Sequence, residues 1–176
     1  MHPIKHFITI TKHRHKVIKY CFKLGIGFQG LFHDLSKYGP TEFWEGAKYY
    51  QGTRSPNARS RELFGYSKAW LHHKGRNKHH YEYWSDIDVK TREYVPVEMP
   101  LRYLKESFAD RIAASKIYSG KDYKDSTPLE YFLRADAKAK MAPKTRETLV
   151  EWLTLLKEKG EKETLKYIKN LKEEKK

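Results

Sequence analysis

The first 33 residues contain no aspartate or glutamate, although they carry six lysine or arginine side chains. The whole chain holds 36 Lys and Arg against 22 Asp and Glu, which gives a formal net charge of +14. Such an excess predicts attraction to anions, whether nucleic acid, nucleotide or membrane surface, without distinguishing among them. The basic stretches 1–33 and 54–80 also contain all nine histidines.

Cysteine and long apolar runs are scarce as well. Cys21 is the single cysteine, which excludes an internal disulfide framework and favours a reducing compartment. No apolar run reaches the roughly 20 residues that a membrane-spanning helix needs, and the charged N-terminal stretch is unlike a signal peptide. We therefore expect a cytoplasmic protein with no membrane partner.

What the chain does contain is a helical pattern interrupted by glycine and proline, which predicts an all-α bundle. With 176 residues, 14% of them aromatic, it is long enough to form a single domain (1–176) with an aromatic core. The expected helices cover about 4–24, 28–37, 41–50, 62–73, 100–118, 126–141, 144–157 and 161–171. Residues 51–61 and 74–99 are expected to be irregular, and no segment shows convincing strand alternation. The charged helix from about 161 is expected to have a solvated face.

The first candidate site residue is His13, on the first predicted helix. It lies between Ile10 and Val17 on an apolar face, so its side chain is expected to point inward. An inward histidine is either a core residue with a satisfied ring or a metal ligand. His15 lies on another face and is a weaker candidate.

The stretch HDLSK places His33 beside Asp34 within an apolar segment. Imidazole and carboxylate groups are ligands of transition metals, so the pair is a candidate metal site. Lys37 projects from the next turn of the same predicted helix face. A lysine there would be repelled by a metal ion but attracted to an anion that bridges to it.

Four further histidines occur within AWLHHKGRNKHHYEYW (69–84). His73 shares the apolar face of the preceding predicted helix and points inward in preference to His72. The second pair, His79 and His80, falls in a predicted turn, where periodicity does not choose between them. A solvated basic loop remains an alternative for His72 and His79.

Asp110 lies among small and apolar residues on one face of the predicted helix 100–118. A buried carboxylate must be paired, protonated or bound to a cation, because its isolated burial is too costly. An ion pair with lysine or arginine and metal ligation are both consistent with this position.

Taken in order, these candidates resemble the H…HD…D signature of the HD-domain metal-dependent phosphohydrolase superfamily, whose fold is a compact all-helical domain. The segments GLFHDLSKYGPTEF and GYSKAWLHHKGRNKHHYEYW are more closely similar to an HD-like family of small bacterial and phage proteins. This resemblance spans about residues 8–135.

The resemblance implies primary metal ligands at His13, His33, Asp34 and Asp110, and ligands for a second ion at His73 and His80. It implies one or two divalent transition metal ions (Mn, Fe, Co, Ni or Zn). The leading hypothesis is hydrolysis of a nucleotide or other phosphate ester by metal-activated water. Asp34 and Lys37 would be catalytic, and a small anionic substrate would be bound by Lys37, Arg76, Asn77 and Arg111.

Two other functions are compatible with the sequence. Mixed-valent di-iron oxygenases of the same superfamily draw four histidines and two aspartates to a pair of irons, a count that this chain satisfies. Alternatively, the chain is a basic helical module that binds nucleic acid, with structural histidines and aromatic residues that stack on bases. The oligomeric state is not predicted.

Overall fold

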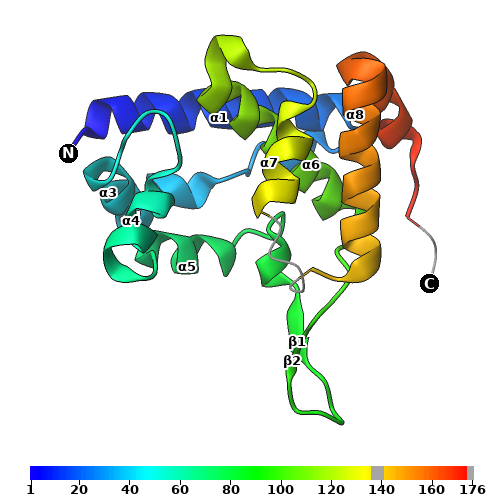
Figure 1. Ribbon diagram of the computed structural model, residues 1–176, viewed down its shortest axis with the longest axis horizontal. Coiled ribbons are helices and arrows are strands. Elements are labelled where there is room, and N and C mark those ends of the chain that lie inside the picture. The colour runs from blue at the N-terminus through cyan, green and yellow to red at the C-terminus, as the bar shows by residue number, and fades with distance from the viewer. Residues whose placement is uncertain (136–140, 174–176) are drawn as a thin grey trace.

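The computed structural model describes residues 1–135 and 141–173 and is mostly helical (Figure 1). Its α-helices are α1 (Pro3–Lys23), α2 (Gly27–Gly30), α3 (Pro40–Lys48), α4 (Pro56–Phe64), α5 (Lys68–Lys74), α6 (Leu101–Ser119), α7 (Thr127–Ala135) and α8 (Pro143–Asn170). The described residues also include the short 3-10 helices η1 (Leu35–Tyr38), η2 (Tyr81–Tyr83) and η3 (Gly120–Asp122). The predicted helical fold class is confirmed.

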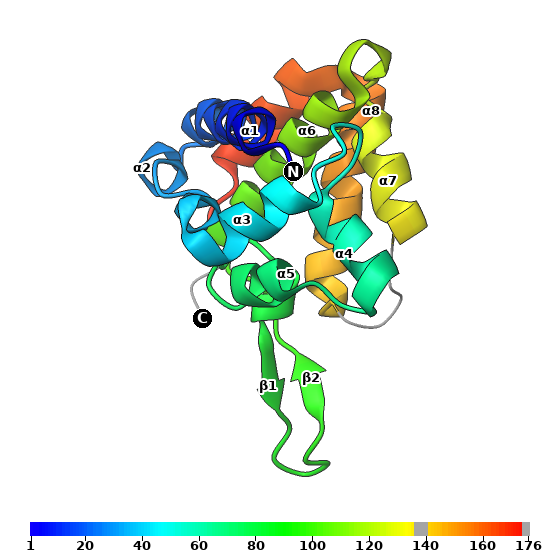
Figure 2. The same ribbon diagram turned by 90° about the vertical axis from the view of Figure 1, so that its left-hand side faces the viewer.

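The hydrophobic core lies where the C-terminal half of α1 meets α6 and α8. The fully buried residues are Val17 of α1, Leu24 just after the end of α1, Phe108 and Ile112 of α6, and Trp152 of α8. Phe108 and Trp152 pack edge to face, with ring centroids 5.9 Å apart. Burying a side chain such as Phe108 contributes about 1.5–3 kcal/mol. The N-terminal half of α1 instead packs against α3, which in turn packs on α5 (Figure 2).

The predicted helix 28–37 is wrong, because the chain is interrupted between two short helical pieces. α2 ends at Gly30, turns follow, and η1 begins only at Leu35. Asp34 adopts a left-handed conformation with φ 55° and ψ 24°. Aspartate tolerates this region better than most residues, and one such residue is enough to stop a helix.

Two boundaries around α4 also differ from the prediction. Residues 56–61, expected to be a loop, are helical from Pro56, a residue suited to the first helical position. The Ser55 side chain accepts a hydrogen bond from the backbone N of Asn57 at 3.3 Å and caps this end. The expected helix 62–73 is divided into α4 and α5, because Gly65 ends α4 with φ 78°.

Residues 85–96 form a β-hairpin that the sequence did not indicate. Strand β1 (Ser85–Ile87) pairs antiparallel with β2 (Tyr94–Pro96), with Ser85 opposite Pro96. The hairpin projects from the helical body (Figures 1 and 2). With three residues per strand, it is too short to show a clear alternation of apolar and polar side chains.

The C-terminal part agrees with the expected pair of helices. Gly160, with φ 76° and ψ 172°, interrupts α8 between the predicted segments 144–157 and 161–171. The predicted helix 126–141 is observed as α7, and its residues 136–140 lie outside the described residues. Within the described ranges, no helix combines the length and apolarity needed to cross a membrane.

Candidate metal centre

α1 presents His13 to the interior. Its buried residues His6, Ile10, His13, Val17 and Tyr20 recur at the three- and four-residue spacing of one helix face. His13 is 7% exposed. Helical periodicity therefore explains its inward position.

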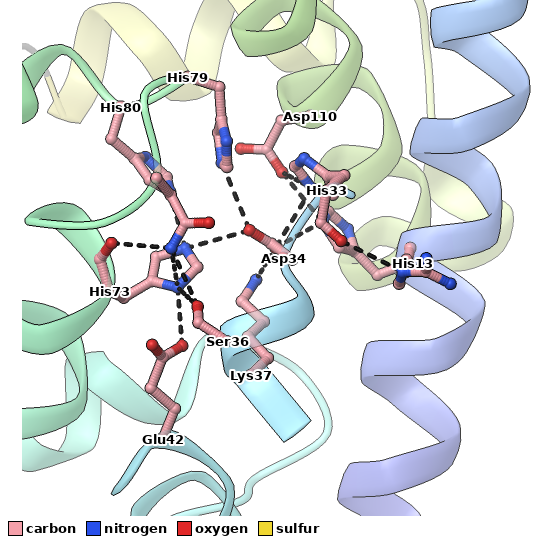
Figure 3. Close-up of polar contacts among 12 residues, drawn as sticks. His13, His33, Asp34, Ser36, Lys37, Glu42, His73, His79, His80 and Asp110 are labelled. Atoms are coloured by element: carbon pink, nitrogen blue, oxygen red, sulfur yellow. Dashed lines mark hydrogen bonds and ion pairs between the residues drawn. The ribbon is translucent and has the colours of Figure 1, made fainter. Parts of the chain in front are cut away.

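The turn after α2 carries His33 and Asp34, which are 2% and 1% exposed. Arg14 of α1 holds this turn in place: its Nε donates to the carbonyl of His33 at 3.2 Å and its Nη2 donates to the carbonyl of Leu31. The left-handed Asp34 redirects the chain here. In a continuous helix these neighbours would point about 100° apart, whereas Figure 3 shows both side chains at the same centre.

α3 positions α5 and, with it, His73. Glu45 of α3 accepts hydrogen bonds from Ser67 Oγ at 2.7 Å and from the backbone N of Ala69 at 3.0 Å, which anchors the first turn of α5. Ser67 itself caps α5 by accepting from the backbone N of Trp70. One helical turn before Glu45, Glu42 contacts Nδ1 of His73 at 2.7 Å.

The loop after α5 carries His79 and His80. Asn77 stabilises the loop, since its Nδ2 donates to the carbonyl of His73 at 2.8 Å and to Ser36 Oγ at 3.0 Å. The ring of His80 packs against Trp70 at a centroid distance of 4.8 Å and against His79 at 4.1 Å. These contacts bring a segment without helical periodicity to the centre.

α6 contributes two acidic residues one turn apart, Glu106 and Asp110. Asp110 approaches His13, with Oδ1 2.9 Å from Nε2, and lies 3.6 Å from His33 Nε2. Glu106 lies behind the histidines and contacts Nδ1 of His33 at 2.8 Å and Nδ1 of His79 at 3.3 Å.

The two oxygens of Asp34 face two different sets of side chains (Figure 3). Oδ2 lies 3.2 Å from His33 Nε2 and 3.7 Å from His13 Nε2. Oδ1 lies 3.3 Å from His73 Nε2 and 3.5 Å from His79 Nε2. Asp34 is thus shared by two groups able to hold metal ions. The first group is His13, His33, Asp34 and Asp110; the second is Asp34, His73, His79 and His80.

Several atoms at this centre are buried without a hydrogen bond. In the described part of the chain, Nε2 of His13, His33 and His79 and Oδ1 of Asp34 form none. The close contacts around them therefore lack hydrogen-bond geometry, and leaving such atoms buried and unsatisfied is costly. All four are lone-pair donors of the kind that binds divalent transition metals. The residues therefore fit metal ions.

The outer carboxylates orient the ring nitrogens. Glu106 faces the Nδ1 atoms of His33 and His79, and Glu42 faces those of His72 and His73 at 2.7 Å each. An Nδ1–H that donates to a carboxylate leaves Nε2 with its lone pair free for a metal ion, an arrangement common around metal-binding histidines. His33, His79 and Glu106 also form a third group with ligand spacing. The contacts of Glu106 with the two Nδ1 atoms explain that group without an ion.

Both aspartates of the centre ionise readily. Burial opposes ionisation, but His33 and Lys37 lower the pKa of Asp34 well below its usual value. The neighbouring rings of His13 and His33 do the same for the pKa of Asp110. Buried carboxylates require compensating positive charge.

The histidines divide by their surroundings. Burial lowers the pKa of His13, and burial with the neighbouring histidines lowers the pKa of His80 well below its usual value, so both rings favour the neutral form. His33 is buried too, but the carboxylates of Asp34, Asp110 and Glu106 raise its pKa well above the usual value. A raised pKa means that the ring of His33 holds a proton more strongly than usual. A metal ion bound there would replace this proton, because histidine binds a metal ion in its neutral form.

A cavity of about 760 Å³ opens onto both groups. His13 and Asp110 of the first group and His73 and His80 of the second line it, together with Lys37. Lys37 Nζ lies 2.5 Å from Asp34 Oδ2. The centre is therefore reachable by a small molecule, with a cation at its edge.

The structure brings together the six residues predicted as ligands: His13, His33, Asp34, His73, His80 and Asp110. Of the predicted substrate-binding residues, Lys37 and Arg111 line the cavity, whereas Arg76 and Asn77 do not. Arg76 is exposed and its Nη1 donates to the carbonyl of His72, and Asn77 supports the histidine loop.

Sequence reasoning did not choose His79, which lies in a turn where periodicity carries no information. It also missed Glu42 and Glu106. For Glu106 a signal existed, since it lies four residues before Asp110 and therefore on the same helix face. Glu42 carried no such signal, because its role depends on contact between α3 and α5.

The fold and the centre define a mostly helical protein with buried histidine and carboxylate groups that could hold metal ions. Residues 2–155 match the model of a protein family described as "Family of unknown function (DUF5662)". The chain belongs to this family. No curated protein and no solved structure matches it.

Proposed function

We propose that this protein is a metal-dependent phosphohydrolase of the HD-domain type that acts on a nucleotide or another phosphate ester. The observation that carries the proposal is Asp34: its carboxylate is buried, and its two oxygens face two separate sets of histidine Nε2 atoms. A bridging carboxylate between two sets of lone-pair donors suits a pair of divalent cations.

Bound cations would supply Lewis acidity and a water molecule of lowered pKa. The chain would supply substrate orientation. Burial opposes protonation of Lys37, but Asp34 and Asp110 raise its pKa above the usual value, so its ammonium stays charged. At the edge of the cavity, it is placed to bind a phosphoryl oxygen of a substrate that reaches the centre.

The cavity walls support an anionic substrate. Beyond Lys37, the lining includes four arginines: Arg54, Arg61, Arg111 and Arg134. Arg54 is paired with Glu62, but Arg61 lies over the ring of Trp70 and Arg111 over that of Phe132. Guanidinium groups held on aromatic rings are well suited to bind phosphate.

The test is phosphate release from a panel of nucleotides, sugar phosphates and p-nitrophenyl phosphate with Mn²⁺, Co²⁺ or Ni²⁺ present. We expect the wild type to hydrolyse at least one substrate and Asp34→Ala to reduce that activity to background. His15→Ala, at an exposed position on α1, is the matched control and should retain full activity. A wild type that is inactive on every substrate with every metal would contradict the proposal.

A di-iron oxygenase is the second candidate. It is favoured by the donor set, in which five imidazoles and two carboxylates also suit iron. We place it second for two reasons. The cationic cavity favours an anionic substrate, and nothing in the described lining indicates an oxidisable one. Two irons per chain with the electronic spectrum of a coupled pair would support it over the hydrolase.

A nucleic-acid-binding module with structural histidines is the third candidate. Structural histidines are expected to have satisfied ring nitrogens, whereas Nε2 of His13, His33 and His79 forms no hydrogen bond within the described residues. Salt-sensitive binding to nucleic acid by protein that binds no metal would favour this candidate.

A further inference from the structure

The cavity also contains two unsatisfied polar groups apart from the candidate ligands. Glu82 Oε2 and Arg111 Nε are both buried, and neither has a hydrogen-bond partner in the described ranges. Both side chains line the cavity that opens onto the metal groups. A buried acceptor and a buried donor are therefore available to a ligand in this cavity.

These two groups come from different elements. Glu82 lies in η2, whose neighbour Trp84 is held by a hydrogen bond from its Nε1 to the carbonyl of Lys78 at 2.8 Å. Arg111 directly follows Asp110 on α6, and its guanidinium lies 4.8 Å from the ring centroid of Phe132. Their charges interact, yet the two side chains form no hydrogen bond or close ion pair with each other. The donor and the acceptor therefore both remain unsatisfied within electrostatic range of each other.

A ligand would satisfy both groups. Glu82 Oε2 accepts a hydrogen bond, and Arg111 Nε donates one, so together they complement a molecule with a donor beside an acceptor. Neighbouring sugar hydroxyls have this pattern, as does the amide or amidine edge of a base. The remaining wall includes the rings of Tyr118, Tyr131 and Phe132, which can pack on the flat face of such a group.

The size of the cavity agrees with an occupant larger than phosphate. Its volume of about 760 Å³ is within the roughly 300–1,000 Å³ typical of small-molecule sites. Inorganic phosphate would fill only a small part of this volume. An organic phosphate carries further polar groups that can contact other lining residues.

We propose that Glu82 and Arg111 form a specificity subsite for the organic part of the substrate. The substrate is then an organic phosphate whose hydroxyl or amino group donates to Glu82 and whose neighbouring oxygen or ring nitrogen accepts from Arg111. This inference rests on the proposed function for the position of the phosphate. The subsite itself depends only on the cavity wall.

The kinetic test compares AMP and glucose 6-phosphate with p-nitrophenyl phosphate, whose ring carries no hydroxyl or amino group. In the Mn²⁺-loaded protein, the ratio of kcat/KM for the preferred organic phosphate to that for p-nitrophenyl phosphate should fall roughly 10- to 100-fold in Glu82→Ala. Arg111→Lys, which keeps the charge but removes Nε, should lower the same ratio. Glu98→Ala, at an exposed position, should leave it unchanged.

A binding test separates this subsite from the proposed reaction. Calorimetric titration should show that the wild type binds AMP or glucose 6-phosphate more tightly than inorganic phosphate, and that Glu82→Ala removes the difference. If this holds while no phosphoester is hydrolysed, the subsite stands and the hydrolase proposal fails. Two outcomes would refute the subsite while the hydrolase proposal stands. In one, p-nitrophenyl phosphate is hydrolysed but neither AMP nor glucose 6-phosphate is preferred to it. In the other, Glu82→Ala affects all three substrates equally.

Discussion

Asp34 connects the two candidate ligand groups through a single carboxylate. It is 1% exposed and has a left-handed backbone. It approaches histidines of α1, of α5, of the turn after α2 and of the loop after α5. A histidine whose Nε2 faces Asp34 differs in role from one that contacts only Glu42 or Glu106. The segment with the pairs His72-His73 and His79-His80 contains both kinds: His79 faces Asp34, and His72 contacts Glu42.

His79→Ala should weaken binding of one of two metal ions, whereas His72→Ala should not. His79 Nε2 lies 3.5 Å from Asp34 Oδ1, but His72 contacts Glu42 and remains partly exposed. Loss of an outer partner typically costs 10- to 100-fold in metal affinity, so loss of a ligand should cost more than about 100-fold. Competition titration with a chromogenic chelator, together with metal content per chain, measures both. Equal affinities in the two variants would show that His79 is not a ligand.

At the level of the elements, close packing of α1 on α2 determines where the His33-Asp34 turn begins. Gly30 ends α2 directly against α1, where an added Cβ would lie 2.4 Å from the Cβ of Cys21. Both backbones would have to separate to accept a side chain. His33 and Asp34 follow three and four residues after Gly30, so this contact affects where these two candidate ligands lie.

Gly30→Ala should lower the free energy of unfolding by about 1–3 kcal/mol, the usual cost of overpacking. It should also weaken metal binding, because the turn moves away from α1. Gly75→Ala is the matched control: Gly75 has φ −75°, its added Cβ would meet only the carbonyls of α5 at 3.4 Å or more, and the change should stay within about 0.5 kcal/mol. Urea denaturation of both variants provides the measurement. Unchanged stability in Gly30→Ala would refute this account of the α1–α2 contact.

At the level of the whole molecule, the candidate ligands join segments distant in sequence. They come from α1, the turn after α2, α5 with its following loop, and α6. A metal ion that binds them favours the folded over the unfolded chain. Folding and metal binding are therefore expected to be coupled.

Addition of Mn²⁺, Co²⁺ or Ni²⁺ should raise the midpoint of thermal unfolding, and a chelator should reverse the change. At a metal concentration 100 times Kd the gain is about 2.7 kcal/mol, or roughly 5–10 °C for a chain of this length. Asp34→Ala should abolish most of the shift. Differential scanning calorimetry with and without metal tests this, and no shift with any of the three ions would contradict coupling.

Stability of the metal-free protein should also depend on His6, away from the candidate ligands. His6 is 6% exposed, between α1 and α3, and burial, with the charge of Lys37, lowers its pKa to about 4. The unfolded chain therefore binds a proton at this position before the folded chain does. As pH falls from 6.5 towards 4, this group should remove up to about 3 kcal/mol of stability.

Urea unfolding across this pH range, with a chelator present, measures the effect as the difference between wild type and His6→Gln. The wild type should lose its advantage over the variant as pH falls. His15→Gln, at an exposed position of the same helix, serves as the control. A difference between wild type and His6→Gln that stays constant with pH would show that His6 is not responsible.

Sequence periodicity predicts the helical class and most helix positions, because apolar residues at three- and four-residue spacing specify a buried face wherever the chain forms a helix. The same periodicity placed His13 on the buried face of α1, and the small neighbours of Asp110 indicated a buried carboxylate on α6. The hairpin and the division into α4 and α5 were missed, since short strands and single capping residues carry little periodic signal.

The sharing of carboxylates and ring nitrogens between the two ligand groups depends on tertiary contacts. The left-handed turn at Asp34, which Arg14 contacts, places its two oxygens toward different histidines. The choice of His79 beside His80, and the pairing of Glu42 and Glu106 with ring nitrogens, depend on contacts between elements tens of residues apart. Such contacts leave no periodic trace in the sequence, because each is made by one side chain at one distance.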